Sequence, residues 1–249
     1  MTWILVERAS GVPDDTQIDD AQRVWRYLTF DRFEWLLEQK RLWLSRADLL
    51  GDPWEVVLSK RDLDSMLAGG YCGGDRDSLL RVLSAERENN FVSCWSAQPD
   101  ESYALWLIYC EKNEGVAIQT TFGRLKASLQ EPVILRPVVY ARDARVPANK
   151  NHPFLADVVV RKRPMFAYEH EVRIAQWKHD AKGKPGLEIP WDAERVLERV
   201  WVHPRADGAF FERVRTAVRT MAPTLIDSVQ WSEMTAAPAA RGLWLQGER

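Results

Sequence analysis

The segment Tyr168–Ile174, "YEHEVRI", carries two carboxylates two residues apart, with an arginine two residues further on. In a β-strand, Glu169, Glu171 and Arg173 would share one face, because side chains alternate with a period of two. Such a strand is commonly half solvated, and Glu171 and Arg173 would then form cross-strand ion pairs. The segment therefore predicts a strand with a polar face, whose function depends on what the rest of the chain brings to it.

Short strands and short helices follow one another irregularly along the chain. Apolar runs bounded by turn residues predict strands over 23–29, 42–45, 91–96, 115–120, 133–141, 196–204 and 225–229. Amphipathic patterns predict a helix that starts at Asp31, and others over 61–67, 76–89, 101–113, 124–129, 154–163 and 210–221. Because regular β-α-β alternation is missing, the pattern favours an α+β fold. We expect a single domain over 1–249, with a polar N-terminal lead-in and a loose C-terminal tail.

Composition narrows the class of protein. The chain has 249 residues and a formal net charge of -2, which gives no electrostatic argument for a dedicated DNA or membrane binder. The N-terminus lacks the pattern of a signal peptide, and no apolar run is long enough to span a bilayer. Cys72, Cys94 and Cys110 are scattered without a C-x-x-C pair, which agrees with a reducing compartment. We expect a cytoplasmic protein without a membrane partner.

Metal and phosphate-loop chemistry have little support. Asp52 and Glu55 of the turn-like "GDPWE", together with His170 and Glu171, are residue types of a hard-metal site, so a metal-dependent nuclease is one alternative. No familiar metal-ligand spacing connects them, and the histidines show no paired spacing either. The glycine-rich "AGGYCGG" over 68–74 fits no phosphate-binding motif and reads as a mobile connection or a lid. We therefore predict no metal.

Three short segments are the candidates for a functional site, and their order along the chain matters. They are "WRY" over 25–27, "FVSCWS" over 91–96, and "EHE" over 169–171. An arginine on an early strand, a serine-containing middle strand and a late Glu-x-Glu resemble the motif set of the arginine-serine-glutamate ADP-ribosyltransferases. A wider succession, "WRYLTFDRFEWLLEQKRLWLS", "GDPWE", "FVSCWS", "ALWLIYCEKNEGVAIQ", "VVYA" and "YEHEVRI", resembles the bacterial domain-of-unknown-function family number 2971. The resemblance implies a split, mostly antiparallel sheet with NAD, as substrate, in a cleft between strand groups.

The resemblance also implies catalytic roles for the two glutamates. Cleavage of the nicotinamide glycosidic bond creates an oxocarbenium-like centre, which a carboxylate stabilises, and Glu171 takes this role by its position in the motif. Glu169 would face the same cleft and act on the acceptor as a general base or bind it. NAD supplies a good leaving group, so no metal is required.

The cofactor-binding roles come from the two upstream motifs. Arg26 would contact the pyrophosphate in bidentate fashion, although an exposed strand arginine is the plain alternative. Tyr27 and Trp95 could stack on the nicotinamide ring, and Ser93 or Ser96 would orient Glu171 by a hydrogen bond. "FVSCWS" departs from the family's usual Ser-Thr-Ser, which leaves open which of the two serines corresponds.

The function implied is transfer of ADP-ribose from NAD to a protein or nucleic-acid acceptor, with NAD hydrolysis beside it. By family analogy, such a protein would act as a bacterial toxin or in phage defence, with an antitoxin-like partner. A non-catalytic module that binds a ligand or a partner in the same cleft is the other alternative. The basic run "VRKRP" over 160–164 reads as a solvated helix end or as a phosphate-binding segment.

Overall fold

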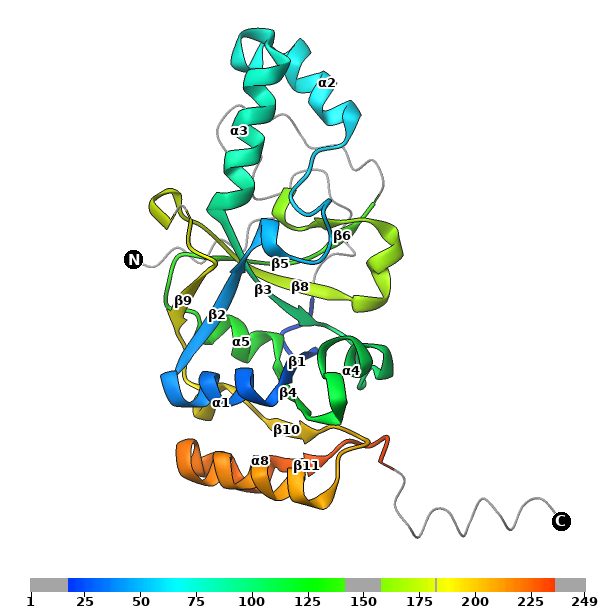
Figure 1. Cartoon of the computed structure of the whole chain (residues 1–249), viewed down its shortest axis with the longest axis vertical. Helices are drawn as coiled ribbons and strands as arrows, with labels where there is room; N and C mark the ends of the chain where they lie inside the picture. Colours follow the sequence, from blue (N-terminus) through cyan, green and yellow to red (C-terminus); the bar gives the residue numbers. More distant parts are fainter. Residues whose placement is uncertain (1–17, 142–157, 182, 236–249) are drawn as a thin grey trace, which may run out of the picture.

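The computed structural model describes residues 18–141, 158–181 and 183–235, and it has the predicted α+β architecture with a mostly antiparallel sheet (Figure 1). The strands are β1 (Arg23–Thr29), β2 (Arg41–Arg46), β3 (Asn90–Ser96), β4 (Gly115–Thr121), β5 (Ile134–Pro137), β6 (Val139–Tyr140), β7 (Arg161–Lys162), β8 (Glu171–Trp177), β9 (Gly186–Pro190), β10 (Arg199–Val202) and β11 (Val229–Trp231). The α-helices are α1 (Phe30–Gln39), α2 (Lys60–Ala68), α3 (Arg76–Asn89), α4 (Tyr103–Tyr109), α5 (Phe122–Ser128), α7 (Ala193–Val196) and α8 (Gly208–Met221). None of the helices in these ranges is long and apolar enough to cross a membrane.

Strand β3 is the point where the nine-stranded sheet forks. Along one edge, β3 pairs with β8 over its whole length, from Asn90 to Ser96. Along the other edge it pairs with β2 at Phe91 and Val92, and with β1 only at Ser96. Strands β1 and β2 therefore diverge from β3. Strands β4, β10 and β11 extend the β1 branch, and β9 extends the β2 branch.

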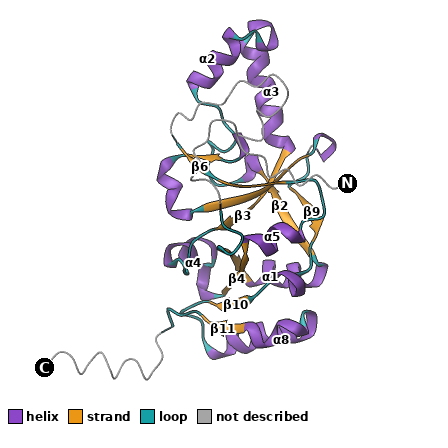
Figure 2. Cartoon of the chain, turned by 180° about the vertical axis from the view of Figure 1, so that it is seen from behind, coloured by secondary structure: helices purple, strands orange, loops and turns teal. Residues whose placement is uncertain are grey.

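Helices cover both faces of the sheet. Apolar side chains of α1, α5 and α8 pack on one face, against strand residues such as Val24, Trp95 and Ile174. Helix α4 packs on the other face, where Trp106 contacts Tyr27. Helices α2 and α3 form a hairpin that projects from one end of the molecule, as both views show (Figures 1 and 2).

Local sequence explains where several helices begin. Side-chain oxygens of Ser59, Asp75 and Asp207 accept hydrogen bonds from backbone N–H groups three residues later, which caps α2, α3 and α8. Helix α1 differs from the prediction, because it begins at Phe30 after Thr29, and no side-chain cap is formed there. The burial of its apolar stripe, which includes Phe33 and Leu37, stabilises α1 instead.

The structure confirms most predicted elements and corrects several others. The helix predicted over 101–113 is helical only over Tyr103–Tyr109, with a 3-10 turn at Glu111–Asn113. The strand predicted over 133–141 breaks into β5 and β6. The strand predicted over 225–229 is a 3-10 turn, Pro223–Ser228, followed by β11. The sequence pattern predicts no strand over Gly186–Pro190, because Pro185, Gly186 and Pro190 interrupt it, yet these residues form β9 by pairing with β2.

Other predictions fall partly outside the described residues. The polar lead-in over 1–17 and most of the C-terminal tail, 236–249, lie there, as does the beginning of the helix predicted over 154–163. Within the described part of that helix, Val158 and Val159 are helical, whereas Arg161–Lys162 form strand β7. The "AGGYCGG" connection lies at the end of the α2–α3 hairpin that points away from the sheet (Figure 1), so it does not cover the fork as a lid would.

Candidate functional site

A cavity of about 150 Å³ lies in the fork of the sheet. Its walls come from β1, β2, β3, α4 and the residues around the start of β8. Arg26, Ser96, Glu169 and Glu171 all line it, so three segments far apart in the sequence contribute to one pocket. These lining residues are Trp25, Arg26, Tyr27, Leu28, Arg32, Ser45, Leu50, Val92, Cys94, Trp95, Ser96, Leu105, Tyr109, Glu169 and Glu171.

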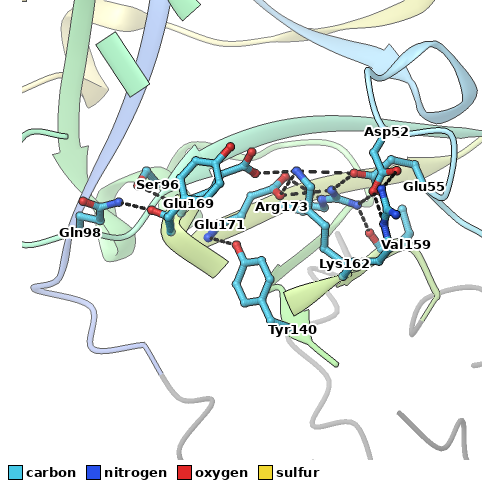
Figure 3. A network of polar contacts seen from close by, with 12 residues as sticks. Asp52, Glu55, Ser96, Gln98, Tyr140, Val159, Lys162, Glu169, Glu171 and Arg173 are labelled. Carbon is cyan, nitrogen blue, oxygen red and sulfur yellow. Dashed lines mark hydrogen bonds and ion pairs between the residues drawn. The ribbon is translucent and has the colours of Figure 1, made fainter. Parts of the chain in front are cut away.

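Glu171 is the first residue of β8 and is buried in a group of ion pairs (Figure 3). Its Oε1 accepts a hydrogen bond from Arg173 Nε at 2.7 Å, and its Oε2 lies 3.2 Å from Lys162 Nζ. Arg173 is fully buried and also forms a bidentate pair with Glu55, with both N–O distances at 2.8 Å. Burial alone would raise the pKa of Glu171, but the charges of Arg173 and Lys162 outweigh it and lower the pKa to about 2. Glu171 is therefore a fixed carboxylate at neutral pH.

Glu169 does not share a strand with Glu171, which corrects the prediction for "YEHEVRI". Pro164–Glu169 form a 3-10 turn, here called η5, and His170 has a left-handed backbone conformation with φ 44°. This corner directs both carboxylates to the same cavity from two different elements. Glu169 Oε2 pairs with Lys162 Nζ at 2.5 Å. Burial raises the pKa of Glu169 despite the opposing charge of Lys162.

The two serines of "FVSCWS" lie on opposite faces of β3. Ser96 lines the cavity and pairs in register with Glu171. Its Oγ donates a hydrogen bond to the backbone carbonyl of Glu169 at 2.7 Å, so it fixes the corner before β8 and not the carboxylate of Glu171, which corrects the expected contact. Ser93 lies outside the cavity lining, and its buried Oγ has no hydrogen-bond partner. The geometry thus selects Ser96 as the serine of the site.

Arg26 lies on the opposite face from Glu171 and reaches the cavity through the fork. The register of β1, β3 and β8 places Trp25, Ser96 and Glu171 on one face, so Arg26 and Trp95 start on the other. Arg26 donates a hydrogen bond to the carbonyl of Trp43 at 3.3 Å, and its guanidinium lies 6.0 Å from the ring centre of Trp95. Burial lowers the pKa of Arg26 to about 10, and the guanidinium stays charged at neutral pH.

The predicted aromatic residues are already engaged with the protein. Tyr27 packs edge-on against Trp106, and its hydroxyl accepts a hydrogen bond from the Ser102 N–H at 2.7 Å. Trp95 is buried against Trp191, with ring centres 6.0 Å apart. Both line the cavity, but they form its wall and are not free rings. Tyr109 of α4, which the sequence did not single out, is 39% exposed at the same cavity and is better placed to meet a ligand.

A second cavity of about 430 Å³ adjoins the first. Arg26, Leu28, Arg32 and Ser45 line both. Asp31, Trp35 and Leu36 of α1 and Trp43 of β2 complete its walls. Arg26 and Arg32 therefore place two positive charges where the two cavities adjoin. The first cavity has Glu169 and Glu171 in its lining, and the second has Trp35, Trp43 and Asp31.

The acidic residues of the nuclease alternative are paired with cations. Asp52 forms a two-bond pair with Arg163, whose shorter N–O distance is 2.7 Å, and it anchors the turn by accepting the Trp54 N–H at 3.0 Å. Glu55 holds Arg173, as described. Among the described residues, no group of three or more histidine, cysteine, aspartate or glutamate side chains could hold a metal ion. The turn predicted for "GDPWE" is present, with the Glu55 N–H donating to the Asp52 carbonyl at 3.0 Å.

The basic run "VRKRP" has a role that the sequence did not predict. Arg161 contacts Asp62 at 3.1 Å, Lys162 contacts Glu169 and Glu171, and Arg163 contacts Asp52. Two residues of the run form strand β7, and its three cations neutralise buried acids, so the interpretation as a solvated helix end is wrong. Its closeness to "YEHEVRI" in sequence was the available signal, but partner acids such as Asp52 and Asp62 lie more than ninety residues away.

Comparison with known proteins supplies no relative: no family model matches the chain, and neither the curated proteins nor the solved structures contain a match.

Proposed function

We propose that the chain is an ADP-ribosyltransferase that cleaves NAD in the forked cavity and transfers ADP-ribose to a macromolecular acceptor. The observation that carries the proposal is the charge arrangement of that cavity. Two glutamates, Glu169 and Glu171, and two arginines, Arg26 and Arg32, line the same cavity. NAD has a cationic nicotinamide ring joined through ribose to an anionic pyrophosphate, and this cavity is complementary to such a sequence of charges.

The fixed charge of Glu171 suits stabilisation of an oxocarbenium-like transition state. In the proposed step, the bond between ribose C1′ and the nicotinamide nitrogen breaks, and nicotinamide leaves with the electron pair. Positive charge develops at C1′ next to the Glu171 carboxylate, which is deprotonated and held by Arg173 before the substrate arrives. The acceptor nucleophile then bonds to C1′, and Glu169 takes its proton. Water in place of the acceptor gives NAD hydrolysis.

The two cavities together offer the space that a dinucleotide needs. The first has only about 150 Å³, whereas ligand pockets usually span about 300–1,000 Å³. The second cavity is larger, and it shares Arg26 and Arg32 with the first as lining residues. We propose that the nicotinamide riboside end occupies the first cavity and that the rest of NAD extends past Arg26 into the second.

The rim of the first cavity favours a protein over a nucleic acid as acceptor. Helix α4 and turn η5 lie on the same side of the molecule in both views and contribute Tyr109 and Glu169 to the cavity (Figures 1 and 2). Leu107, Ile108 and Met165 on these elements are 50%, 46% and 58% exposed. Neither element contains a lysine or arginine, whereas nucleic-acid binding depends on neutralising phosphates. Exposed apolar patches of this kind mark protein-binding sites.

The biological role is proposed on the family resemblance alone. A cytoplasmic enzyme that modifies a protein with ADP-ribose would serve as a bacterial toxin or in phage defence, and an antitoxin-like partner would restrain it. The competing proposal is a non-catalytic module that binds NAD or another ligand in the same cavity. The dense pairing of Glu171 with cations favours that competitor, because it reduces the negative potential at the cavity wall.

Incubation with labelled NAD tests the proposal. Wild type should release nicotinamide and label an acceptor in a lysate, and the label should be removed by protease and spared by nuclease when the products are treated afterwards. Glu171→Gln should lower the rate of release by at least about a hundredfold. Glu188→Gln is the matched control, because Glu188 forms an exposed pair with Arg41 at 3.9 Å on the β2–β9 branch. It should leave the rate unchanged.

The outcomes separate the alternatives. Saturable NAD binding without nicotinamide release would establish the binding module and reject the enzyme. Equal release by wild type and by a folded Glu171→Gln would remove Glu171 from catalysis. Label that protease treatment spares and nuclease treatment removes would identify a nucleic-acid acceptor.

A further inference from the structure

The two-stranded sheet formed by β6 and β7 supports Glu171 from two directions. Tyr140 and Lys162 are register partners in this sheet. The hydroxyl of Tyr140 accepts the backbone N–H of Glu171 at 2.7 Å, and the ammonium of Lys162 lies 3.2 Å from its carboxylate (Figure 3). One pair of residues in a small, separate sheet therefore fixes both the main chain and the side chain of the candidate catalytic residue.

Lys162 contacts three carboxylates that come from three separate segments. Its Nζ lies 2.5 Å from Glu169, 3.2 Å from Glu171 and 3.6 Å from Glu55. The Lys162 side chain is only 9% exposed, and it is absent from the cavity lining to which Glu169 and Glu171 belong. The ammonium therefore contacts two carboxylates of the cavity wall without lining the cavity itself.

Lys162 neutralises negative charge that Arg173 alone leaves uncompensated among the buried carboxylates. Three buried carboxylates facing one arginine would carry an uncompensated double negative charge, and such a cluster takes up protons. Lys162 supplies the second cation and bonds to both cavity-lining carboxylates at once. The remaining single negative charge at the wall is the charge that a developing cation needs.

We propose that Lys162 and Tyr140 are positioning residues that hold Glu171 in place, and that Lys162 also keeps Glu169 and Glu171 ionised. The inference rests on the proposed function for its catalytic consequence, but not for its electrostatic one. Lys162 does not touch the reacting atoms. Its effect reaches the substrate only through the two carboxylates, and the effect of Tyr140 only through the start of β8.

Several titratable or charged groups surround Lys162. They are Glu55 before α2, Cys94 on β3, Tyr109 on α4, Tyr140 on β6, Glu169 on η5, and Glu171 and Arg173 on β8. Burial raises the pKa of the Cys94 thiol, and the charge of Glu171 adds to it. Burial likewise raises the pKa values of Tyr109 and Tyr140. These three groups are neutral at physiological pH, so the carboxylates and the two cations decide the charge.

Carboxyl-carbon NMR titration tests the electrostatic part without any substrate. In Lys162→Met, the pKa of Glu171 should rise by at least about one unit relative to wild type, and Glu169 should rise as well. Lys60→Met is the matched control, because it removes an exposed lysine paired with Asp64 at 2.6 Å, and it should shift neither glutamate. Glu171 titrating unchanged in a folded Lys162→Met would overturn the proposal.

Kinetics of nicotinamide release test the catalytic part. Lys162→Met should lower kcat at least about tenfold with KM for NAD changed less than about twofold, and its activity should fall at a higher pH than that of wild type as the solution is acidified. Lys162→Arg should restore part of kcat and return the acid limb toward wild type. Tyr140→Phe should lower kcat about fivefold, in line with one lost hydrogen bond, while Tyr103→Phe on α4 should not.

The two experiments fail independently. If wild type releases no nicotinamide, the proposed function is wrong, and the NMR titration still decides whether Lys162 controls the glutamates. If Lys162→Met does not fold, Lys162→Gln, which also removes the charge, and Tyr140→Phe carry the test, and unchanged kcat in both would overturn the positioning role. A change in KM alone would place Lys162 at the ligand and overturn it as well.

Discussion

The two faces of strand β3 differ in whether their buried polar groups have hydrogen-bond or ion-pair partners. On the face of Ser96, cross-strand neighbours include Glu171 and Arg173, and their charged groups bond to one another. On the other face, Ser93 Oγ and Trp95 Nε1 are buried in an apolar core without hydrogen-bond partners. Alternate residues of one six-residue motif therefore lie in a charged environment and in an apolar one.

Polar groups on both faces are buried, but only those on the Ser96 face have hydrogen-bond or ion-pair partners. The presence of a partner, and not burial, therefore decides how much the removal of a polar group affects stability. Each charge on the Ser96 face depends on its neighbours, because a buried ion left alone is strongly unfavourable. Ser93 Oγ and Trp95 Nε1 have no hydrogen-bond partner to lose. Their desolvation is unfavourable, and burial of the surrounding apolar side chains offsets it. Removal of a polar group should thus be severe on one face and harmless on the other.

The largest expected effect is on stability, from Arg173→Met. This variant leaves Glu55 and Glu171 buried without their common partner, so we expect the free energy of unfolding to fall by about 3–5 kcal/mol. Denaturant unfolding followed by tryptophan fluorescence measures it. The matched control is Arg41→Met, whose exposed pair with Glu188 should contribute less than about 1 kcal/mol. Similar losses in both variants would mean that burial adds nothing to the ion pairs.

The next effect is the acid sensitivity of the charged face. The pKa of Glu171 is lowered from its ordinary 4.5 to about 2, so its contribution to stability is complete above pH 4.5 and is lost as the pH falls toward 2. A shift of this size corresponds to roughly 3 kcal/mol. Glu169, with its raised pKa, acts in the opposite sense at higher pH. Stability of Glu171→Gln should therefore depend less on pH than that of wild type between pH 4.5 and 2, and parallel curves would contradict the assigned pKa.

The smallest and most direct comparison is the pair Ser96→Ala and Ser93→Ala. Ser96→Ala removes the hydrogen bond to the Glu169 carbonyl and should cost about 1 kcal/mol and lower nicotinamide release severalfold. Ser93→Ala removes an unpartnered hydroxyl and should change stability by less than about 0.5 kcal/mol, or increase it slightly, with activity unchanged. Thermal unfolding and the release assay of both variants suffice. A larger loss for Ser93→Ala would reverse the distinction between the faces.

Much of the fold could be predicted because its signals are local. Apolar periodicity located β1 and α3 to the residue, and the α+β class followed from the irregular order of elements. The predictions failed where tertiary pairing decides the structure. Strand β9 needs β2 as a partner, and the end of α4 at Tyr109 depends on how Cys110 packs beneath β1 and β4.

The site could be predicted in part, for the same reason. Arg26, Ser96, Glu169 and Glu171 were singled out from sequence, and the structure brings them to one cavity. Lys162 could not be singled out, because a basic run beside a strand is ordinary and its partner Glu55 is distant in sequence. The fork could not be predicted either, since it depends on β1 and β2 pairing with different parts of β3.

The left-handed conformation of His170 has a consequence for how this site can vary. A residue with φ of 44° suits glycine and asparagine, and it excludes the β-branched side chains that otherwise favour strands. The middle position of Glu-x-Glu therefore accepts only a limited set of residue types. A sequence carrying valine, isoleucine or threonine there could keep both glutamates and still fail to direct them to the same place, so a motif search that leaves the position free would accept chains that cannot form this corner.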